Sequence, residues 1–288
     1  MRVFTHWVAP TLLAIASFSL FAKPLNIDVY HGDGNSFYVT ASIISGDKDA
    51  ILIDSGFTQA DALRIAAKIL DSGKNLKTIF ISQADPDYYF GAATLRQLFP
   101  AVNIITTPAV KHTIATKLAG KLAFWGPKLG ANGPQSGLVP DVINTDILML
   151  EGERIEIKAT QGQFNHRPYL WLPSNQAIVG NVAVYADVHL WMADAQSDAA
   201  QQAWQAQLEA MLALNPKLVV PGHMKPNSAM DATAIHYSLN YLKAFSAAKA
   251  ASVQSTELID KMQQLYPSAV LPMALEIGAK VHTGEMQW

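Results

Sequence analysis

The hydrophobic positions of the chain alternate between strand spacing and helix spacing. Short apolar runs bounded by turn residues indicate buried strands, and apolar residues three and four apart indicate helices that cover a core. Between Gln59 and Leu70 the apolar residues recur at helical spacing, and Gly73 follows as a cap. This pattern predicts strands at residues 26–30, 38–44, 50–54, 78–81 and 102–106, with helices at 59–70, to about 98, and from about 110.

The second half of the chain repeats this change from strands to helices. A helix is predicted from Asp198 to Leu214, since Ser197 can cap its start and Pro216 stops it. The segment from Phe124 to Pro140 is rich in glycine and proline, which predicts a long surface loop. Strands are predicted at 146–150, 154–159, 169–172, 177–179 and 218–220, and mostly helix from about 229.

Composition narrows the class of protein. Half of the 288 residues are hydrophobic and 15% are charged, which allows a large core. The net charge is −2 and no stripe of lysine and arginine occurs, so we expect no nucleic-acid partner. The absence of cysteine excludes disulfides and thiolate metal ligands. No linker divides the sequence, and residues 23–288 are therefore predicted to form a single domain.

The first 22 residues have the pattern of an export signal. Arg2 gives a positive start, an apolar run follows from Trp7 to Phe21, and Ala22 is a small residue at a plausible cleavage point. We therefore predict a signal peptide at 1–22, a mature chain without a membrane span, and a periplasmic or secreted location. The alternative is that the apolar run stays in place as a membrane anchor.

Two junctions between a strand and a loop contain the candidate chemistry. Gln83, Asp85 and Asp87 follow one buried strand at alternate positions. His223 follows another buried strand, directly after Gly222. Side chains at the carboxyl ends of strands gather at the mouth of a sheet, where binding and catalysis are usually found.

Together these junctions resemble the metal-binding motifs of the metallo-β-lactamase superfamily. That family has a His-x-His-x-Asp-His loop after a strand, and further on a Gly-His, a Gly-Asp and a final Gly-His. The run Leu52-Ile53-Asp54-Ser55-Gly56 also resembles the family's early strand that ends in aspartate. Asp87 and His223 are retained here, whereas Gln83, Asp85, Tyr88 and Gln163 stand in place of histidines and Asn181 in place of the bridging aspartate.

The resemblance covers roughly residues 26–225 and implies a fold, an activity and a metal site. The implied fold is of the α+β class, a four-layer αββα sandwich with two mixed sheets packed face to face and helices outside. Residues 26–174 would form roughly its first half. The implied activity is hydrolysis, and the implied cofactor is zinc. This branch of the family would have a degenerate metal-ligand motif.

The substitutions weaken the implied metal site. Amide oxygens are neutral and weak donors for zinc, and a tyrosine, whose ordinary pKa is about 10, binds weakly unless it loses its proton. The strong ligand types that remain are Asp85, Asp87 and His223. We therefore predict at most one divalent metal ion, zinc or another, held weakly by these three residues, and we do not expect a two-zinc centre.

The candidate residues also have structural interpretations. Asp87 could cap the following helix, and His223 could be a buried histidine with a satisfied hydrogen bond. His166, which is close to Gln163 in the sequence, is a candidate replacement ligand. His166, His189 and Trp191 are candidate pocket residues, with ordinary core packing as the alternative.

Two functions therefore stay open. The first is a hydrolase that acts on a small ester, lactone or amide, with Asp87 and His223 as catalytic residues. The second is a catalytically inactive protein of the same fold that captures a small ligand in the cleft. The hydrolase is placed slightly ahead because Asp85, Asp87 and His223 all survive.

Overall fold

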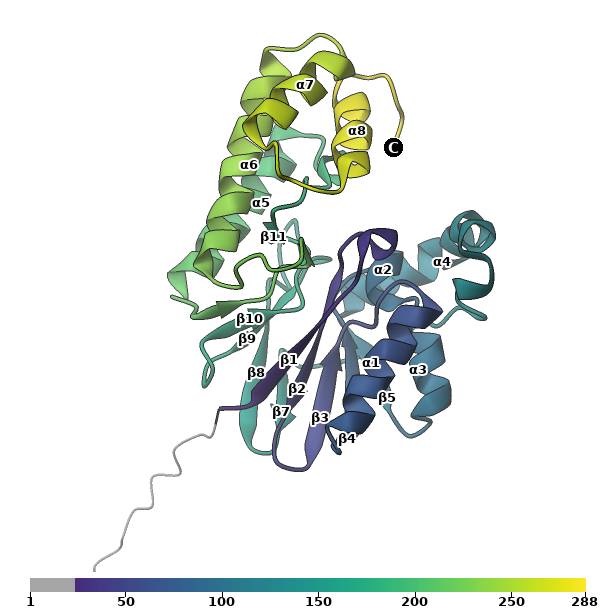
Figure 1. The fold of residues 1–288 in the computed structure, drawn as a ribbon. Coiled ribbons are helices and arrows are strands. Elements are labelled where there is room, and N and C mark those ends of the chain that lie inside the picture. Colours follow the sequence, from purple (N-terminus) through teal and green to yellow (C-terminus); the bar gives the residue numbers. More distant parts are fainter. Residues whose placement is uncertain (1–23) are drawn as a thin grey trace, which may run out of the picture.

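The computed structural model describes residues 24–288, so the predicted signal segment at 1–22 lies outside the described residues. Two sheets pack face to face, and helices cover their outer surfaces (Figure 1). The predicted four-layer αββα sandwich of the α+β class is confirmed. None of the helices within residues 24–288 is both long and apolar enough to span a bilayer.

The first sheet has the strand order β1-β2-β3-β4-β5-β6. Its first three strands are antiparallel neighbours, and β3 to β6 run parallel, so helices connect the later strands. The strands are β1 (Asn26–His31), β2 (Thr40–Ser45), β3 (Asp49–Ile53), β4 (Asn75–Ile81), β5 (Asn103–Thr106) and β6 (Asp141–Val142). The connecting helices are α1 (Gln59–Asp71), α2 (Pro86–Tyr89), α3 (Ala92–Leu98) and α4 (Pro108–Leu129).

The second sheet has the order β12-β10-β9-β8-β7, and a short parallel pair, β11 with β13, lies beside it. Its strands are β7 (Ile147–Leu150), β8 (Glu153–Lys158), β9 (Tyr169–Leu172), β10 (Ala177–Val179) and β12 (Leu218–Val219), and the pair is β11 (Tyr185–Ala186) and β13 (His223–Met224). The later helices are α5 (Asp198–Ala213), α6 (Ala232–Ala250), α7 (Ser255–Leu265) and α8 (Pro272–His282).

Three apolar clusters hold the layers together. One lies between the sheets and joins Ile53 and Phe80 of the first sheet to Leu170 and Val179 of the second. A second cluster packs α1, α3 and α4 on the outer face of the first sheet, and a third packs α5 to α8 on the second sheet. Each sheet is therefore buried on both faces, which explains why many strands are apolar runs rather than alternating ones.

The predicted loop from Phe124 to Pro140 is wrong in its first part, because α4 continues to Leu129 through Pro127. The helix persists because Trp125 packs edge-on against Phe37 and Phe57, at ring-centroid distances of 5.6 Å and 5.2 Å. This tertiary contact outweighs the local preference of the Gly-Pro pair for a turn. An aromatic side chain is thereby placed at the end of the sandwich.

Hydrogen bonds at the surface join the two sheets at the opposite end of the sandwich. Glu151 and Gly152 form the two-residue hairpin between β7 and β8, and both have positive φ. The Glu151 carboxylate accepts the backbone N–H groups of Asp47, Lys48 and Asp49 at 2.8, 2.7 and 2.7 Å. These three bonds lower the pKa of Glu151 and tie the β7–β8 hairpin to the β2–β3 turn.

Candidate functional site

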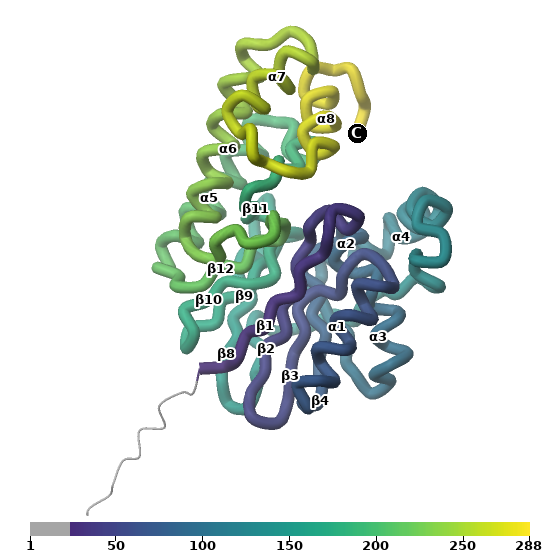
Figure 2. Tube along the Cα trace, in the orientation of Figure 1, coloured from purple at the N-terminus to yellow at the C-terminus, as the bar shows by residue number. Residues whose placement is uncertain are grey.

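A cavity of about 590 Å³ lies where β4 leads into α2, a size common for small-molecule sites. Figure 2 places α2, α4 and the C-terminal end of the chain at the same end of the sandwich. Of the residues singled out in the sequence, the lining includes Gln83, Asp85, Asp87, Tyr88, His166, Trp191 and His223. The two strand-end loops predicted to meet at the mouth of the sheets therefore do meet.

The backbone beneath this cavity is fixed by a buried carboxyl and by two close approaches of glycine. Asp54, at φ 63°, accepts hydrogen bonds from the Ser82 N–H at 2.7 Å and the Ser82 hydroxyl at 2.8 Å. A Cβ on Gly91 would lie 2.0 Å from the Ser55 carbonyl oxygen, and one on Gly222 would lie 2.1 Å from that of Asn181. We call Asp54, Gly91 and Gly222 the backbone frame. Burial raises the pKa of Asp54 to about 7.

Asp87 and His223 face each other at the base of the cavity. The Nδ1–H of His223 donates to the Phe37 carbonyl oxygen at 2.9 Å, because a carbonyl can only accept. Nε2 is then the free ring nitrogen, and it lies 3.5 Å from Oδ2 of Asp87. Burial lowers the pKa of His223 to about 4 and raises the pKa of Asp87 well above its ordinary value. Near neutral pH the histidine is therefore neutral, with a lone pair on the nitrogen that faces Asp87.

The structure tests the two structural interpretations, Asp87 as a helix cap and His223 as a buried histidine. The helix N-cap of α2 is Asp85, without a side-chain cap bond, and Asp87 lies within the first turn. His223 does have the satisfied hydrogen bond of a buried histidine, yet its second nitrogen faces the cavity. Tyr185 stacks on its ring at a centroid distance of 5.0 Å, and Tyr88 meets it edge-on at 5.6 Å.

Gln83 and Tyr88 line the cavity, and each has a buried polar atom without a partner in the described part of the chain. Their side chains are 2% and 1% exposed, and neither Gln83 Nε2 nor Tyr88 Oη has a hydrogen-bond partner within residues 24–288. Burial raises the pKa of Tyr88 well above its ordinary value, so the phenol keeps its proton. An unpaired buried polar group costs about 1–3 kcal/mol, so each atom favours a partner in the cavity. We call Gln83, Asp87, Tyr88 and His223 the cavity floor.

Two of the positions matched to family ligands do not face the cavity. Gln163 is exposed and is not part of the lining, because the loop before β9 turns it toward solvent. Asn181 is buried, but its Nδ2 donates to the Val220 carbonyl at 3.0 Å and its Oδ1 accepts from the Val184 N–H at 2.9 Å. The amide of Asn181 therefore holds two backbone segments together, and its polar atoms are already engaged.

Of the three candidate pocket residues, two line the cavity and one does not. His166 and Trp191 line the cavity. His189 does not, because its ring is buried against α6 and its Nδ1 lies 2.9 Å from the hydroxyl of Tyr241. Burial lowers the pKa of His189 to about 4, as it does for a neutral core histidine.

Sequence reasoning missed the charged residues that complete the lining. Arg167 is buried and contacts Asp194 at 3.4 Å, with its guanidinium over the rings of Phe164 and Trp204. Asp194 also accepts the indole N–H of Trp288 at 2.6 Å. Lys117 and Lys121 reach the cavity from α4. Their spacing of four residues on a predicted helix was the available signal, because such residues share one face.

The donor set does not fit the zinc centre that the resemblance implies. Within residues 24–288, no three histidine, aspartate or glutamate side chains come together closely enough to hold a metal ion. Asp85, Asp87 and His223 are thus not brought together as the predicted ligand group. Asp87 faces His223, whereas burial and the charge of Asp194 raise the pKa of Asp85, which also senses Lys121 and Arg167. The charge of Asp85 also raises the pKa of Asp87.

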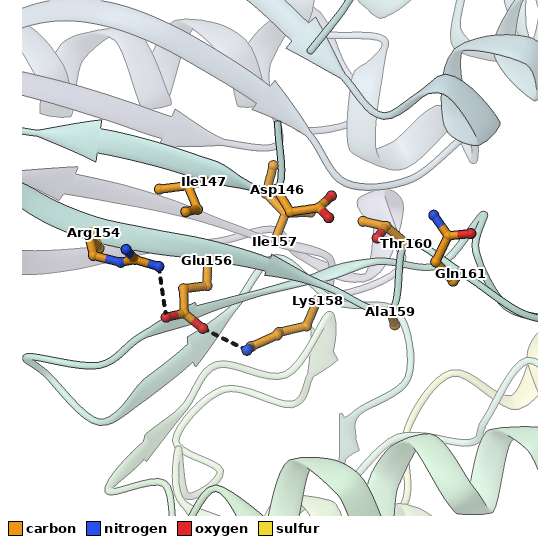
Figure 3. Close-up of a pocket in the computed structure, with 9 residues that line it drawn as sticks. All are labelled: Asp146, Ile147, Arg154, Glu156, Ile157, Lys158, Ala159, Thr160 and Gln161. Atoms are coloured by element: carbon orange, nitrogen blue, oxygen red, sulfur yellow. Dashed lines mark ion pairs between the residues drawn. The ribbon is translucent and has the colours of Figure 1, made fainter. Parts of the chain in front are cut away.

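A second pocket, of about 430 Å³, lies over β8 and contains none of the candidate residues (Figure 3). The Glu156 carboxylate lies 3.6 Å from Arg154 and 2.6 Å from Lys158, so these charges pair with one another (Figure 3). Exposed pairs of this kind contribute little to stability, and the pocket has no aromatic lining. The chemistry of the molecule is therefore concentrated in the first cavity.

Comparison with solved structures places the fold among known proteins. A metallo-β-lactamase family protein from Thermus thermophilus has a TM-score of 0.61 at 14% identity, with 89% of this chain and 93% of that chain covered. The DIM-1 metallo-β-lactamase exposed to ceftazidime has a TM-score of 0.52 at 14% identity, covering 80% and 99%. A metallo-β-lactamase from Pontibacter korlensis has a TM-score of 0.50 at 18% identity, covering 76% and 93%.

Comparison of the sequence gives the family directly. A search of the curated proteins found no match. The family model of the metallo-β-lactamase superfamily matches residues 31–223, a range that begins in β1 and ends at the floor histidine. That match spans more than half of the chain and includes both strand-end loops of the site. The chain therefore belongs to the metallo-β-lactamase superfamily.

Proposed function

We propose that this protein binds a small organic molecule in the cavity, and that side chains of the cavity floor contact its polar group. The observation that supports this most directly is the pair of buried, unpartnered atoms, Gln83 Nε2 and Tyr88 Oη. Both residues stand at positions where the family has metal-ligating histidines. An acceptor atom of the ligand can pair with both, since an amide N–H and a phenol O–H are donors.

The walls of the cavity support the same proposal. Phe37, Phe57, Trp125 and Trp191 line it, and Phe37 contacts the other three rings at centroid distances of 5.2, 5.6 and 6.4 Å. Small-molecule sites are typically apolar and aromatic with a few placed polar groups. The ligand is accordingly a molecule with an apolar body and at least one acceptor atom.

The test is a thermal-shift screen of small molecules, followed by calorimetry on the wild type, Gln83→Leu and Tyr88→Phe. Compounds that bind the floor should bind each variant about tenfold more weakly, which corresponds to one lost hydrogen bond. Both variants should fold with an unchanged or higher melting temperature, because each loses an unpartnered buried atom. Ligands that bind the wild type and both variants with equal affinity would contradict the proposal.

Tyr89→Phe is the matched control for this experiment. The hydroxyl of Tyr89 is likewise buried without a partner in the described part of the chain, but Tyr89 does not line the cavity. Its removal should leave ligand affinity unchanged. A loss equal to that of Tyr88→Phe would show that the effect comes from packing and not from contact with the ligand.

Membership of the superfamily supports a hydrolase-like or related function, and one observation favours hydrolysis as a second candidate. The facing Asp87 and His223 combine a carboxyl whose pKa is raised with a neutral imidazole, a pairing suited to acid–base catalysis on an ester, lactone or amide. Asp87→Asn and His223→Gln should each abolish such hydrolysis. Turnover of an ester and lactone panel that survives both changes would exclude this pair as the catalytic residues.

A further inference from the structure

One wall of the cavity is a polar and aromatic stripe on α4. Thr113, Lys117, Lys121 and Trp125 all line the cavity and follow one another at intervals of four residues. Residues spaced by four lie on the same helical face. The helix therefore presents two ammonium groups beside an indole ring, along a single line that borders the cavity.

These two lysines are not neutralised by close ion pairs. Neither Lys117 nor Lys121 lies within 4.0 Å of a carboxylate of residues 24–288, whereas Lys111 of the same helix reaches Asp141 at 4.0 Å. Both lysines do interact at longer range with Asp85. Lys121 also interacts at longer range with Asp87.

The other two carboxyl groups of the lining each have a closer partner than the lysines. Asp87 lies 3.5 Å from His223 at the floor. Asp194 lies 3.4 Å from Arg167 and accepts the hydrogen bond of Trp288. The charged side chains of the lining are thus three carboxyl groups and three cations, but the charges of Lys117 and Lys121 lie on the α4 stripe next to aromatic rings, without a close carboxylate partner among the described residues.

We propose, on the basis of the ligand-binding function above, that the ligand is an aromatic anion, whose ring lies among the aromatic side chains and whose carboxylate or sulfonate faces Lys117 and Lys121. The rings of Trp125 and Phe37 provide the apolar contact, since flat aromatic faces stack with little loss of conformational freedom. The lysines contribute attraction that is weakened by salt. The acceptor atom that pairs with Gln83 and Tyr88 belongs to the body of the molecule.

Two fluorescent probes of nearly the same shape test this proposal. Anilinonaphthalenesulfonate is anionic, and phenylnaphthylamine is its neutral counterpart; both brighten in apolar sites. The wild type should bind the anionic probe more tightly. In the double variant Lys117→Gln, Lys121→Gln, affinity for the anionic probe should fall about tenfold and affinity for the neutral probe should stay within about twofold. Both lysines extend from the surface of α4, and circular dichroism checks that the variant is folded.

Lys111→Gln is the matched control, because it removes one charge from α4 outside the cavity. It should leave both affinities unchanged. Raising the NaCl concentration from about 0.02 M to about 0.5 M should weaken binding of the anionic probe to the wild type much more than to the double variant.

The outcomes separate the two proposals. If both probes bind and the double variant binds the anionic probe as tightly as the wild type does, the aromatic-anion proposal is overturned and the cavity remains a binding site. If neither probe binds, the aromatic-anion proposal is overturned, and the ligand-binding function is decided by the screen with Gln83→Leu and Tyr88→Phe. If Lys111→Gln weakens the anionic probe as strongly as the double variant does, the attraction is a property of the whole helix surface, and the proposed anion site is overturned.

Discussion

The backbone frame and the cavity floor lie against each other, yet they differ in what holds them in place. In the frame, Gly91 and Gly222 approach other backbone segments so closely that any side chain would collide. In the floor, Gln83 and Tyr88 are buried side chains without partners in the described part of the chain, although they stand where the family has ligands. The comparison indicates that in this chain close packing of backbone segments holds the loops in place, while the side chains at two of the family's ligand positions are left without partners among the described residues.

The largest change in stability is expected when a methyl group is added to a glycine of the backbone frame. Gly91→Ala would put a Cβ 2.0 Å from a backbone oxygen, so the loops must separate. We expect a loss of more than about 3 kcal/mol of stability, or no soluble protein. Urea unfolding measures the change. Gly120→Ala is the control, since its Cβ would meet no atom within 4 Å on α4 and should stabilise the helix by about 0.5–1 kcal/mol.

A second test uses the buried carboxyl of the frame. The folded pKa of Asp54 is raised to about 7, above its ordinary value, so its ionisation destabilises the folded protein as the pH rises from about 4 to about 7. Asp54→Asn removes this effect and suits the positive φ. The stability of Asp54→Asn relative to the wild type should therefore rise with pH across that window, by on the order of a few kcal/mol.

Thermal unfolding at several pH values measures this difference. Asp71→Asn, on the exposed end of α1, should show a constant difference from the wild type. A flat difference for Asp54→Asn would mean that Asp54 is ionised throughout the range, held by its two hydrogen bonds from Ser82.

A smaller effect is expected at Asn181, the backbone neighbour of Gly222 in the frame. Asn181→Asp restores the residue type of the family but replaces the N–H group that donates to Val220, so two oxygens would face each other. We expect a loss of about 1–3 kcal/mol, larger at pH 8 than at pH 5, because a protonated acid can still donate. Asn103→Asp, at an exposed position of β5, should change stability little. An unaltered stability of Asn181→Asp would mean that the loops tolerate a carboxylate there.

Sequence alone could predict the alternation of strands and helices and the meeting of Asp87 with His223. Both residues directly follow buried strands, and strand ends converge at the edge of a sheet. Gln163 could not be placed, because the pairing of loop residues with family positions depends on loop paths that no periodicity encodes. His189 is a predicted pocket residue with core packing as the alternative, and its partner Tyr241 on α6 places it in the core.

Other differences arise from contacts between distant parts of the chain. The continuation of α4 past Trp125 depends on Phe37 and Phe57, so the local glycine and proline pattern predicted the wrong state. The predicted first half also extended to Ser174, whereas the first sheet ends at Val142 and the second begins at Ile147. Hydrophobic strands look alike in either sheet, and only their pairing assigns them.

The Glu151 carboxylate has a consequence for the exchange of amide protons with solvent. The N–H groups of Asp47, Lys48 and Asp49 belong to an exposed turn, where exchange is normally fast, yet each is bonded to Glu151. Their exchange requires the Glu151 carboxylate to release them, either by rotation of its side chain or by movement of the β7–β8 hairpin. Their protection from exchange therefore measures how firmly Glu151 holds the β2–β3 turn at the end remote from the cavity.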